Sequence, residues 1–364
     1  MENKINDSKN KNNIIKDYSL YSNEPEKLLK IAQEQINQNN IKQGIDILKN
    51  TIDLARKKFS GENKIELTKF YNKYADAILQ KIISSQNNND NDNYITDSDI
   101  AYKYINEANE ILENYLEQYN DKSPNDLNKD IINYYLQLSY NYNLLAIYSK
   151  VNLDYKNANE FYNISIDITK KYDDKFSRNL TALYFEQAQI LIYDPNKCLL
   201  SLYKCKVIME YYLQKEITKI NLDIKLYLDE NDLDLNNISY NDEKIYKNKD
   251  LIETNIELNK SKENNPNIAE FMDIIKDINN KIENVVLELK EYDAFKKKRE
   301  EIKKIYNVNN ENINNENINK ENIMNDLTYK MSKINLINFR RNEPSGGDDD
   351  IKKVEEDYTK EKLI

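Results

Sequence analysis

The residue types that carry most enzyme chemistry are scarce in this sequence. It contains no histidine, which excludes Ser–His and Cys–His catalytic arrangements and histidine ligation of a metal. Its two cysteines, Cys198 and Cys205, are seven residues apart on one predicted helix, so their Cα atoms would lie ~10 Å apart, too far for a mutual disulfide. Two cysteines also cannot form a four-cysteine zinc site. We therefore expect no enzyme activity, no cofactor and no metal, and we expect a binding or scaffolding protein.

The composition narrows the class of binding protein. The 364 residues are 39% hydrophobic and 32% charged, with a mean hydropathy of −0.87, which suits a solenoid with disordered ends. Only 4 glycines and 5 prolines are present, too few for the tight turns of a β-rich fold. The net charge of −10 disfavours direct contact with nucleic acid or a membrane surface and favours a basic protein partner. The alternative, that an acidic chain is simply soluble, stays open.

Small residues recur in a fixed register. Ala146 is followed after twelve residues by Ala158, then after four by Tyr162 and after three by Ser165. This spacing is typical of the two helices of a tetratricopeptide repeat, where only small residues let the helices cross closely. The same register recurs in a first repeat (Ala32, Gly44, Leu48, Thr51) and, two residues shorter, in a fourth (Ala188, Cys198, Leu202, Cys205). We predict an all-α tetratricopeptide-repeat (TPR) solenoid of four helix pairs with a long C-terminal capping helix.

The second repeat is interrupted. Ala75 and Ala101 occupy its two small positions but are twenty-six residues apart, which predicts a 14-residue insertion in the turn, within 85–99. The insertion contains four aspartates that could meet a basic partner: Asp90, Asp92, Asp97 and Asp99. The alternative, that coding bias alone produces a polar insert, stays open.

The rest of the chain divides by composition. We expect a disordered N-terminus over 1–24, the TPR domain over 25–228, a flexible acidic insertion over 229–265, the capping helix over 266–306 and a disordered low-complexity tail over 307–364. Apolar residues from Phe271 to Leu289 follow a helical period, which predicts the capping helix. A coiled-coil homodimer is the rival interpretation of the same stripe. No signal peptide or transmembrane helix is expected.

This organisation resembles the nuclear autoantigenic sperm protein (NASP) family of histone chaperones over about residues 28–305. The position of the interruption between Ala75 and Ala101 carries most of the likeness. Three local segments add to it: 57–62 is similar to the family's link between repeats one and two, 154–161 to the start of a helix in repeat three, and 174–186 to the entry to repeat four. Arg340 and Arg341 are weakly similar to the family's nuclear import motif, and Lys296–Arg299 is a second basic cluster.

The resemblance implies binding of histones H3 and H4, which would be kept soluble for chromatin assembly, and it implies nuclear localisation with possible shuttling to the cytoplasm. Repeat geometry predicts a concave groove lined by Lys69, Asn72, Asp76, Tyr140, Asn143, Ile147, Ala182, Phe185 and Gln189. Ile147 and Ala182 stand where family members carry glutamates, so we expect apolar and aromatic recognition. Ile147 and Phe185 could instead be ordinary core residues between repeats.

A second function fits the same repeats. Repeats of forty-two residues, as between Ala146 and Ala188, also occur in cargo adaptors such as kinesin light chains. The alternative is therefore a cytosolic TPR adaptor that binds peptide motifs of a partner protein. Such adaptors need no interruption in a repeat.

Overall fold

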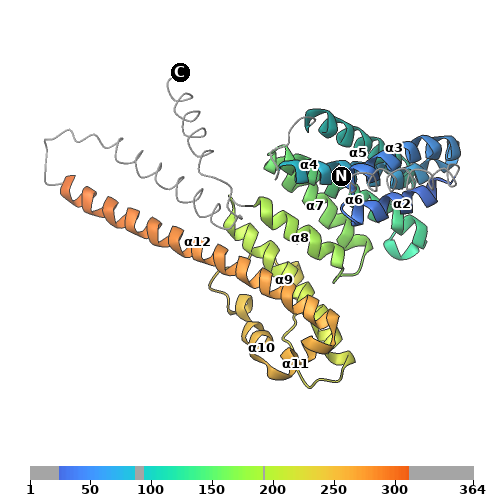
Figure 1. Cartoon of the computed structure of the whole chain (residues 1–364). Helices are drawn as coiled ribbons and strands as arrows, with labels where there is room; N and C mark the ends of the chain where they lie inside the picture. Colours follow the sequence, from blue (N-terminus) through green and yellow to red (C-terminus); the bar gives the residue numbers. More distant parts are fainter. Residues whose placement is uncertain (1–23, 87–93, 192, 311–364) are drawn as a thin grey trace, which may run out of the picture. The chain divides into compact units, whose positions relative to one another are not determined.

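The computed structural model describes residues 24–86, 94–191 and 193–310. In this part of the chain the fold is all-α with no strand, and eight helices pack as four consecutive pairs (Figure 1). The predicted TPR-type solenoid is confirmed. Its pairs are α2 (Pro25–Asn37) with α3 (Ile41–Lys58), α4 (Thr68–Gln86) with α5 (Tyr94–Leu116), α6 (Lys129–Val151) with α7 (Tyr155–Tyr172), and α8 (Arg178–Ile190) with α9 (Pro195–Lys219).

The chain divides into two units, residues 1–293 and 294–364. The four pairs and the first part of α12 (Pro266–Asn310) belong to the first unit. In the second unit the described residues are those of α12 from Ala294 onward. The disorder expected at the N-terminus up to residue 23, and in the tail from residue 311, falls outside the described residues. Residues 307–310 of the expected tail form the end of α12.

Side-chain caps define where several helices begin. The first N–H groups of a helix lack intrahelical acceptors, and a short polar side chain satisfies one of them. Asn128 accepts a hydrogen bond from the Ile131 N–H at the start of α6, and Asp154 accepts one from the Asn157 N–H at the start of α7. At the start of α9, Asp194 is the cap and Pro195 occupies the first turn, where its missing N–H costs nothing.

Small residues lie where the helices of a pair cross. Ala32, Ala146 and Ala158 have no exposed surface. At Gly44, a Cβ atom would lie 2.5 Å from Cγ1 of Ile36 and 3.1 Å from the carbonyl oxygen of Ala32, so no larger residue fits without a shift. The predicted register therefore corresponds to close helix crossings in the first and third pairs.

The second pair differs from its predicted boundaries. The insertion was expected over 85–99, but α4 continues to Gln86 and α5 already begins at Tyr94. Residues 87–93 lie outside the described residues. Ser98 is buried, and Asp97 forms an ion pair with Lys81 of α4 at 2.5 Å. Asp97 lies in the first turn of α5, where an acidic side chain interacts favourably with the helix dipole. This explains why α5 begins at Tyr94 and includes Asp97 and Asp99.

The TPR domain was expected to extend to residue 228, but its last helix ends before that residue. Helix α9 ends at Lys219, and 222–228 has no regular secondary structure, with buried and exposed side chains alternating along it. Alternation with period two fits an extended chain and does not fit a helix. Gln214 of α9 fixes this segment: its Oε1 accepts from the Leu226 N–H at 2.6 Å and its Nε2 donates to the Ile224 carbonyl at 3.2 Å.

The segment expected to be a flexible insertion, 229–265, is packed onto α9 and α12. It contains the 3₁₀ turns η5 (Glu230–Asp234) and η6 (Glu243–Tyr246) and the short helices α10 (Lys249–Thr254) and α11 (Ile256–Asn264). Single apolar residues anchor it in the core: Leu233, Ile238, Ile245, Ile252 and Leu258. Their irregular spacing hid them from a search for helical periods.

A buried ionic group ties the same segment to α9. Lys206 is fully buried, and its Nζ donates to the carbonyls of Ile245 at 2.6 Å and Lys247 at 3.1 Å. The Glu210 carboxylate lies 3.6 Å from that ammonium and accepts a hydrogen bond from Asn248 at 2.9 Å. Because a buried charge is costly unless it is paired, this group fixes the position of the segment.

Helix α12 covers the fourth pair. Its side chains share one hydrophobic cluster with α8 and α9 through Phe271, Ile275, Ile278, Ile282, Val286 and Leu289. The expected capping helix thus corresponds to α12, which ends at Asn310 rather than at residue 306. No helix in the described part of the chain is both long and apolar enough to cross a membrane.

Candidate functional site

The first helices of pairs two and three lie side by side and are joined by polar contacts. The Tyr140 hydroxyl of α6 donates to Asp76 of α4 at 2.7 Å, and Gln80 also donates to Asp76 at 3.0 Å. The hydroxyl of Thr68 donates to Gln137 of α6 at 2.9 Å. The groove residues predicted from the sequence lie on the first helices of pairs two, three and four, and we call them the first-helix face: Lys69, Asn72 and Asp76 on α4; Tyr140, Asn143 and Ile147 on α6; Ala182, Phe185 and Gln189 on α8. On α4 and α6 this face is held rigidly by the hydrogen bonds between the two helices.

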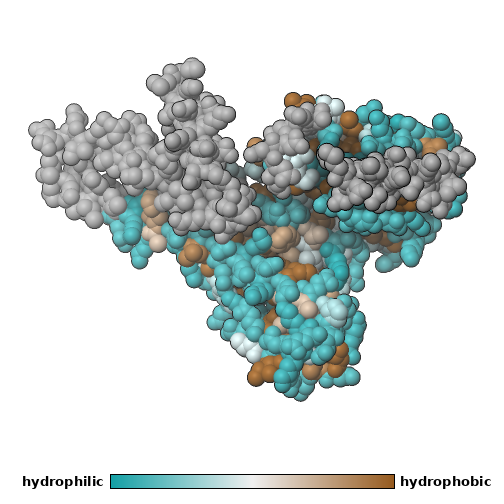
Figure 2. Space-filling view, viewed as in Figure 1, coloured by the Kyte–Doolittle hydropathy of each residue, from teal (hydrophilic) through white to brown (hydrophobic). Residues whose placement is uncertain are grey.

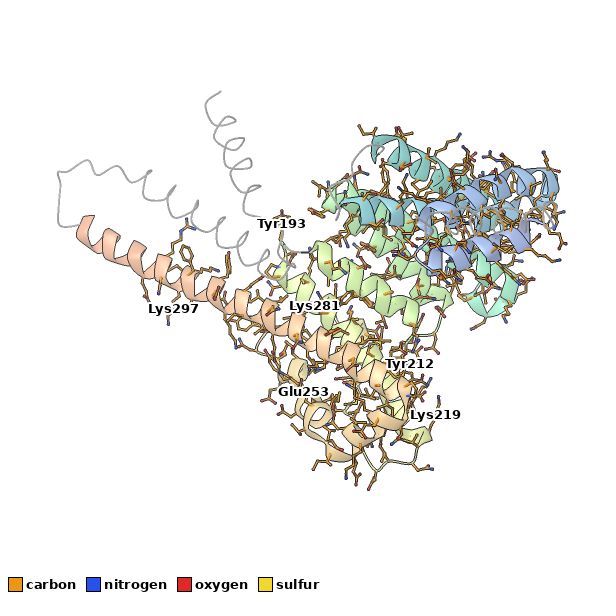
Figure 3. The ribbon with its side chains drawn as sticks, in the orientation of Figure 1. Tyr193, Tyr212, Lys219, Glu253, Lys281 and Lys297 are labelled. Atoms are coloured by element: carbon orange, nitrogen blue, oxygen red, sulfur yellow. The ribbon has the colours of Figure 1, made fainter. Side chains whose placement is uncertain are left out.

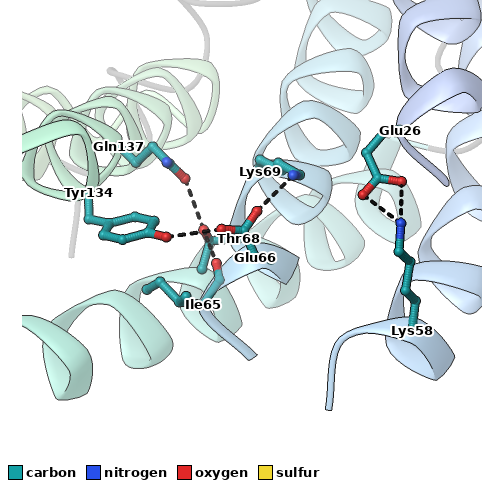
Figure 4. A network of polar contacts seen from close by, with 8 residues as sticks. All are labelled: Glu26, Lys58, Ile65, Glu66, Thr68, Lys69, Tyr134 and Gln137. Atoms are coloured by element: carbon teal, nitrogen blue, oxygen red, sulfur yellow. Dashed lines mark hydrogen bonds and ion pairs between the residues drawn. The ribbon is translucent and has the colours of Figure 1, made fainter. Parts of the chain in front are cut away.

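A second polar network lies at the start of the same two helices (Figure 4). Glu66 accepts from Lys69 Nζ at 2.8 Å and from the Tyr134 hydroxyl at 3.0 Å. The hydrogen bond from Lys69, with a smaller contribution from Tyr134, holds the pKa of Glu66 below its usual value. Lys69, a predicted site residue, is therefore oriented by Glu66 and is not a freely moving cation.

Two predicted site residues are amides with unsatisfied oxygens. Asn72 on α4 is only 2% exposed. Asn143 on α6 is half-buried. The Oδ1 atoms of both are buried and have no hydrogen-bond partner among the described residues. Ile147, one turn after Asn143, is half-buried against the core of the first three pairs.

The residues predicted on α8 have different surroundings. Ala182 is exposed. Phe185 is half-buried against the core of the fourth pair, and Nζ of Lys281 on α12 lies 5.3 Å from its ring centroid. Gln189 accepts a hydrogen bond from Lys150 of α6 at 2.9 Å. The contact of Lys281, which is labelled in Figure 3, with Phe185 places α12 beside the predicted face at α8.

The first-helix face carries mixed charge. Lys73 Nζ lies 5.3 Å from the centroid of the Tyr140 ring, and Lys150 forms an ion pair with Glu186 at 2.9 Å. With Lys69 and Asp76, cations and carboxylates are interspersed along α4 and α6. The acidic surplus of the whole chain is therefore not concentrated on this face.

The four aspartates of the predicted insertion separate into two groups. Asp90 and Asp92 lie outside the described residues. Asp97 and Asp99 are on α5, where Asp97 is paired with Lys81 and Asp99 is exposed. The two aspartates of the predicted insertion that the structure describes, Asp97 and Asp99, therefore lie on a helix instead of in a loop.

Sequence reasoning missed a cleft of about 680 Å³ near the start of α12. Arg178 lies over the rings of Tyr212 and Phe271, with its Cζ 5.5 and 4.9 Å from their centroids. Lys215 and Lys219 also line the cleft, and Tyr212 and Lys219 are labelled in Figure 3. These residues come from α8, α9 and α12, so no single stretch of sequence pointed to them.

Among the described residues, no group of three or more Cys, Asp or Glu side chains could hold a metal ion. Both cysteines are buried, and burial raises the pKa of each thiol to about 12, so both are protonated and unreactive at neutral pH.

On the face shown in Figure 2, hydrophobic residues form small separate patches among hydrophilic ones.

Comparisons with known proteins give little further guidance. No protein-family model matches the chain, and no curated protein matches it. Among solved structures, one similar chain is a Podosopora anserina protein described as a kinesin light chain with nearly identical TPR-like repeats. It shares 10% identity, covers 72% of this chain and 98% of its own, and superposes with a TM-score of 0.30. We draw no functional conclusion from this likeness.

Proposed function

We propose that this protein is a non-enzymatic histone chaperone that binds histone H3 and the H3–H4 complex and keeps them soluble for chromatin assembly. The binding surface in this proposal is the part of the first-helix face on α4 and α6. One observation carries it: Tyr140 and Asp76, with Thr68 and Gln137, hold these two helices in a fixed relation. A surface that is already ordered loses little conformational entropy when a partner binds.

Two features of the architecture support the identity of the partner. The turn of the second pair is interrupted between Gln86 and Tyr94, and a long helix, α12, packs on the fourth pair. These are the features on which the resemblance to the histone chaperone family rests. The net charge of −10 would attract a basic histone over a distance, and the α4–α6 face would make the short-range contacts. The proposal needs no catalytic step, cofactor, nucleic acid or membrane, and it assumes that the protein works in the nucleus.

A second candidate is a cytosolic adaptor that binds a peptide motif of another protein. The mixed charge of the α4–α6 face favours it, because Lys69 and Lys73 lie beside Asp76. A face built only to neutralise a basic histone would be expected to carry mainly carboxylates.

Titration of purified H3–H4 with the full chain tests the proposal. At 0.15 M salt we expect a saturable, soluble complex by sedimentation velocity and calorimetry. The other pair of core histones, which is also strongly basic, serves as the control, and we expect it to bind more weakly. Equal binding of the two histone pairs would mean that charge alone acts, and no saturable binding of H3–H4 would contradict the chaperone proposal and favour the adaptor.

A further inference from the structure

The cleft of about 680 Å³ between α8, α9 and the start of α12 has a positively charged lining. Its described lining residues include three cations, Arg178, Lys215 and Lys219, and one carboxylate, Glu216. The chain as a whole carries a net charge of −10. The lining therefore has the opposite sign to the whole molecule, which favours an acidic ligand over a basic one.

Aromatic rings line the same cleft beside these cations. Tyr212 of α9 and Phe271 of α12 stack with their ring centroids 5.8 Å apart. Nζ of Lys215 lies 4.5 Å from the centroid of the Tyr211 ring. A hydrogen bond with Tyr211, with a smaller contribution from Asp174, raises the pKa of Lys215, so this amine stays charged. The cleft thus combines apolar surface, which an apolar side chain of a ligand can cover, with positive charge that attracts carboxylates.

Arg178 is oriented without using its hydrogen-bond donors. Its guanidinium lies over the two stacked rings and makes no hydrogen bond with another described residue; the Glu270 carboxylate is 3.7 Å away. Arg56 also lies over two rings, but its guanidinium donates to Tyr71 at 2.9 Å and to Glu107 at 3.1 Å. Arg56 is therefore satisfied within the fold, whereas the donors of Arg178 remain for a ligand. A planar guanidinium can pair with a carboxylate through two parallel hydrogen bonds.

The carboxylates near the cleft leave two of the three cations available. Glu216 pairs with Lys219 at 2.5 Å, and this hydrogen bond lowers the pKa of Glu216, so the pair is neutral as a whole. Arg178 and Glu270 have side chains that are 55% and 51% exposed, and an ion pair at such a surface contributes little. A carboxylate of a ligand can therefore replace Glu270 at Arg178, and Lys215 is exposed.

A second cleft, of about 850 Å³, adjoins the first and shares Gln214, Thr218 and Leu228 with it. It continues along residues 221–228, and its described lining is neutral overall. Sites for small molecules have volumes of about 300–1,000 Å³. The two adjoining clefts together exceed that range, so they suit a peptide segment.

We propose that the two clefts bind a short acidic segment of a partner protein, in which an apolar side chain covers the rings of Tyr212 and Phe271 while a carboxylate pairs with Arg178. Lys215 attracts a further carboxylate of the same segment. The α4–α6 face proposed for H3–H4 lies on other helices, so this inference does not rest on that function. The two sites would let one chain hold an acidic partner as well as a histone.

A single-stranded nucleic acid is the other anionic ligand that stacks on aromatic rings. Its affinity comes from neutralising several phosphates in a row, and the cleft offers only Arg178 and Lys215 for this purpose. The net charge of −10 also repels a polyanion. A short acidic segment needs only a few positive contacts, and the observations therefore favour it.

Fluorescence anisotropy measures the affinity of the full chain for a labelled peptide in which one phenylalanine stands between two pairs of glutamates. Matched peptides carry glutamine in place of glutamate, or glycine in place of phenylalanine. The protein variants are Arg178→Gln, Arg178→Lys and Lys215→Gln. Arg56→Gln is the control, because it removes the same charge from an arginine whose donors are used inside the fold. Melting temperatures show which variants are folded.

We expect wild type to bind the peptide with glutamates and phenylalanine saturably, and to bind both matched peptides at least ten-fold more weakly. Arg178→Gln should lower the affinity at least ten-fold while its melting temperature stays close to wild type. Arg178→Lys should not restore the affinity, because lysine lacks the planar pair of donors. Lys215→Gln should weaken binding several-fold, and Arg56→Gln should leave it unchanged.

Absence of saturable binding by wild type would overturn the inference, and so would wild-type affinity in both Arg178→Gln and Lys215→Gln. If Arg178→Gln does not fold, unchanged affinity in Lys215→Gln, which alters an exposed side chain, overturns it alone. Tighter binding of a single-stranded oligonucleotide that the same substitutions reduce would also overturn it and would identify a nucleic-acid site. These measurements do not use H3–H4, so they are independent of the proposed function.

Discussion

Tyr140 of the third repeat donates a hydrogen bond to Asp76 of the second repeat over 2.7 Å, and this bond joins the first helices of the two pairs. Burial and the neighbouring Asp76 carboxylate raise the pKa of Tyr140, so its hydroxyl stays protonated and remains a donor at any physiological pH. The bond therefore fixes the face that we assign to the partner.

Removing the Tyr140 hydroxyl should weaken the contact between α4 and α6 without unfolding the protein. In Tyr140→Phe, Asp76 keeps its bond from Gln80 and is half-buried, so we expect a loss of about 1 kcal/mol in unfolding free energy. Urea denaturation followed by circular dichroism measures it. The control is Tyr193→Phe, whose side chain is 82% exposed and should show no change. Equal stability of both variants would mean that the bond does not hold α4 against α6.

The crossing in the third pair should not tolerate a larger residue. Ala158 has no exposed surface, so Ala158→Leu forces the helices apart, at a cost of about 1–3 kcal/mol. Ala182→Leu makes the same change at an exposed position of α8 and should leave the melting temperature close to wild type. If both variants melt like wild type, the helices do not cross at Ala158.

Helix α12 should contribute to the core of the fourth pair. Ile282 is 1% exposed and Leu287, five residues later on the same helix, is 58% exposed. We expect Ile282→Ala to cost about 2–5 kcal/mol, because it removes buried methyl groups and leaves a cavity. Leu287→Ala should have almost no effect in the same thermal unfolding experiment. Similar effects of the two substitutions would show that α12 does not pack on this core through Ile282.

The buried Glu210 predicts a specific pH dependence. Burial raises the pKa of Glu210 to about 7, above its ordinary value of 4.5. The folded state therefore holds this proton more tightly than the unfolded state, and the stability that this provides is lost as pH rises from about 4.5 through about 7. Glu210→Gln removes the titrating group.

We expect the unfolding free energy of wild type, minus that of Glu210→Gln, to decrease by about 2–3 kcal/mol between pH 5 and pH 8. Taking the difference removes the contribution of other carboxyl groups to the unfolding free energy. Glu66 is one of them: its pKa is lowered, so its contribution to stability is lost as pH falls instead of as pH rises. Urea titrations at several pH values give this difference. A constant difference would mean that Glu210 is ionised over the whole range.

Local packing made the helix pairs predictable from the sequence. The crossing positions Ala32, Gly44, Ala146 and Ala158 must be small whatever lies elsewhere in the chain, and all four are buried. The segment after α9 could not be predicted in this way. Its place depends on contacts between distant residues, such as Lys206 Nζ with the carbonyls of Ile245 and Lys247, and its apolar residues follow no period.

The candidate site was predictable only in part. The register assigned Asp76, Tyr140 and Phe185 to one face, because they stand one residue after, six before and three before the small residue of their repeats, and these positions share one face of a helix. It gave no information on their partners. The bond between Tyr140 and Asp76 depends on how one repeat is offset from the next, and the contact of Phe185 with Lys281 depends on the path of α12.

The central claim, that the α4–α6 face and not the overall charge holds the histone, is tested most directly by the salt dependence of binding. Affinity for H3–H4 is measured at 0.15 and 0.5 M salt for wild type, for Ile147→Ala, and for a variant with Asp90, Asp92 and Asp99 changed to Asn. Asp97 is left unchanged because it pairs with Lys81. Attraction between exposed charges is screened beyond about 8 Å at physiological salt, whereas apolar contact is little affected.

We predict that Ile147→Ala weakens binding about ten-fold at both salt concentrations, as expected for the loss of about 1.4 kcal/mol of apolar contact. The aspartate variant should weaken binding only at the lower concentration. The account is contradicted if Ile147→Ala binds like wild type while the aspartate variant fails to bind at both.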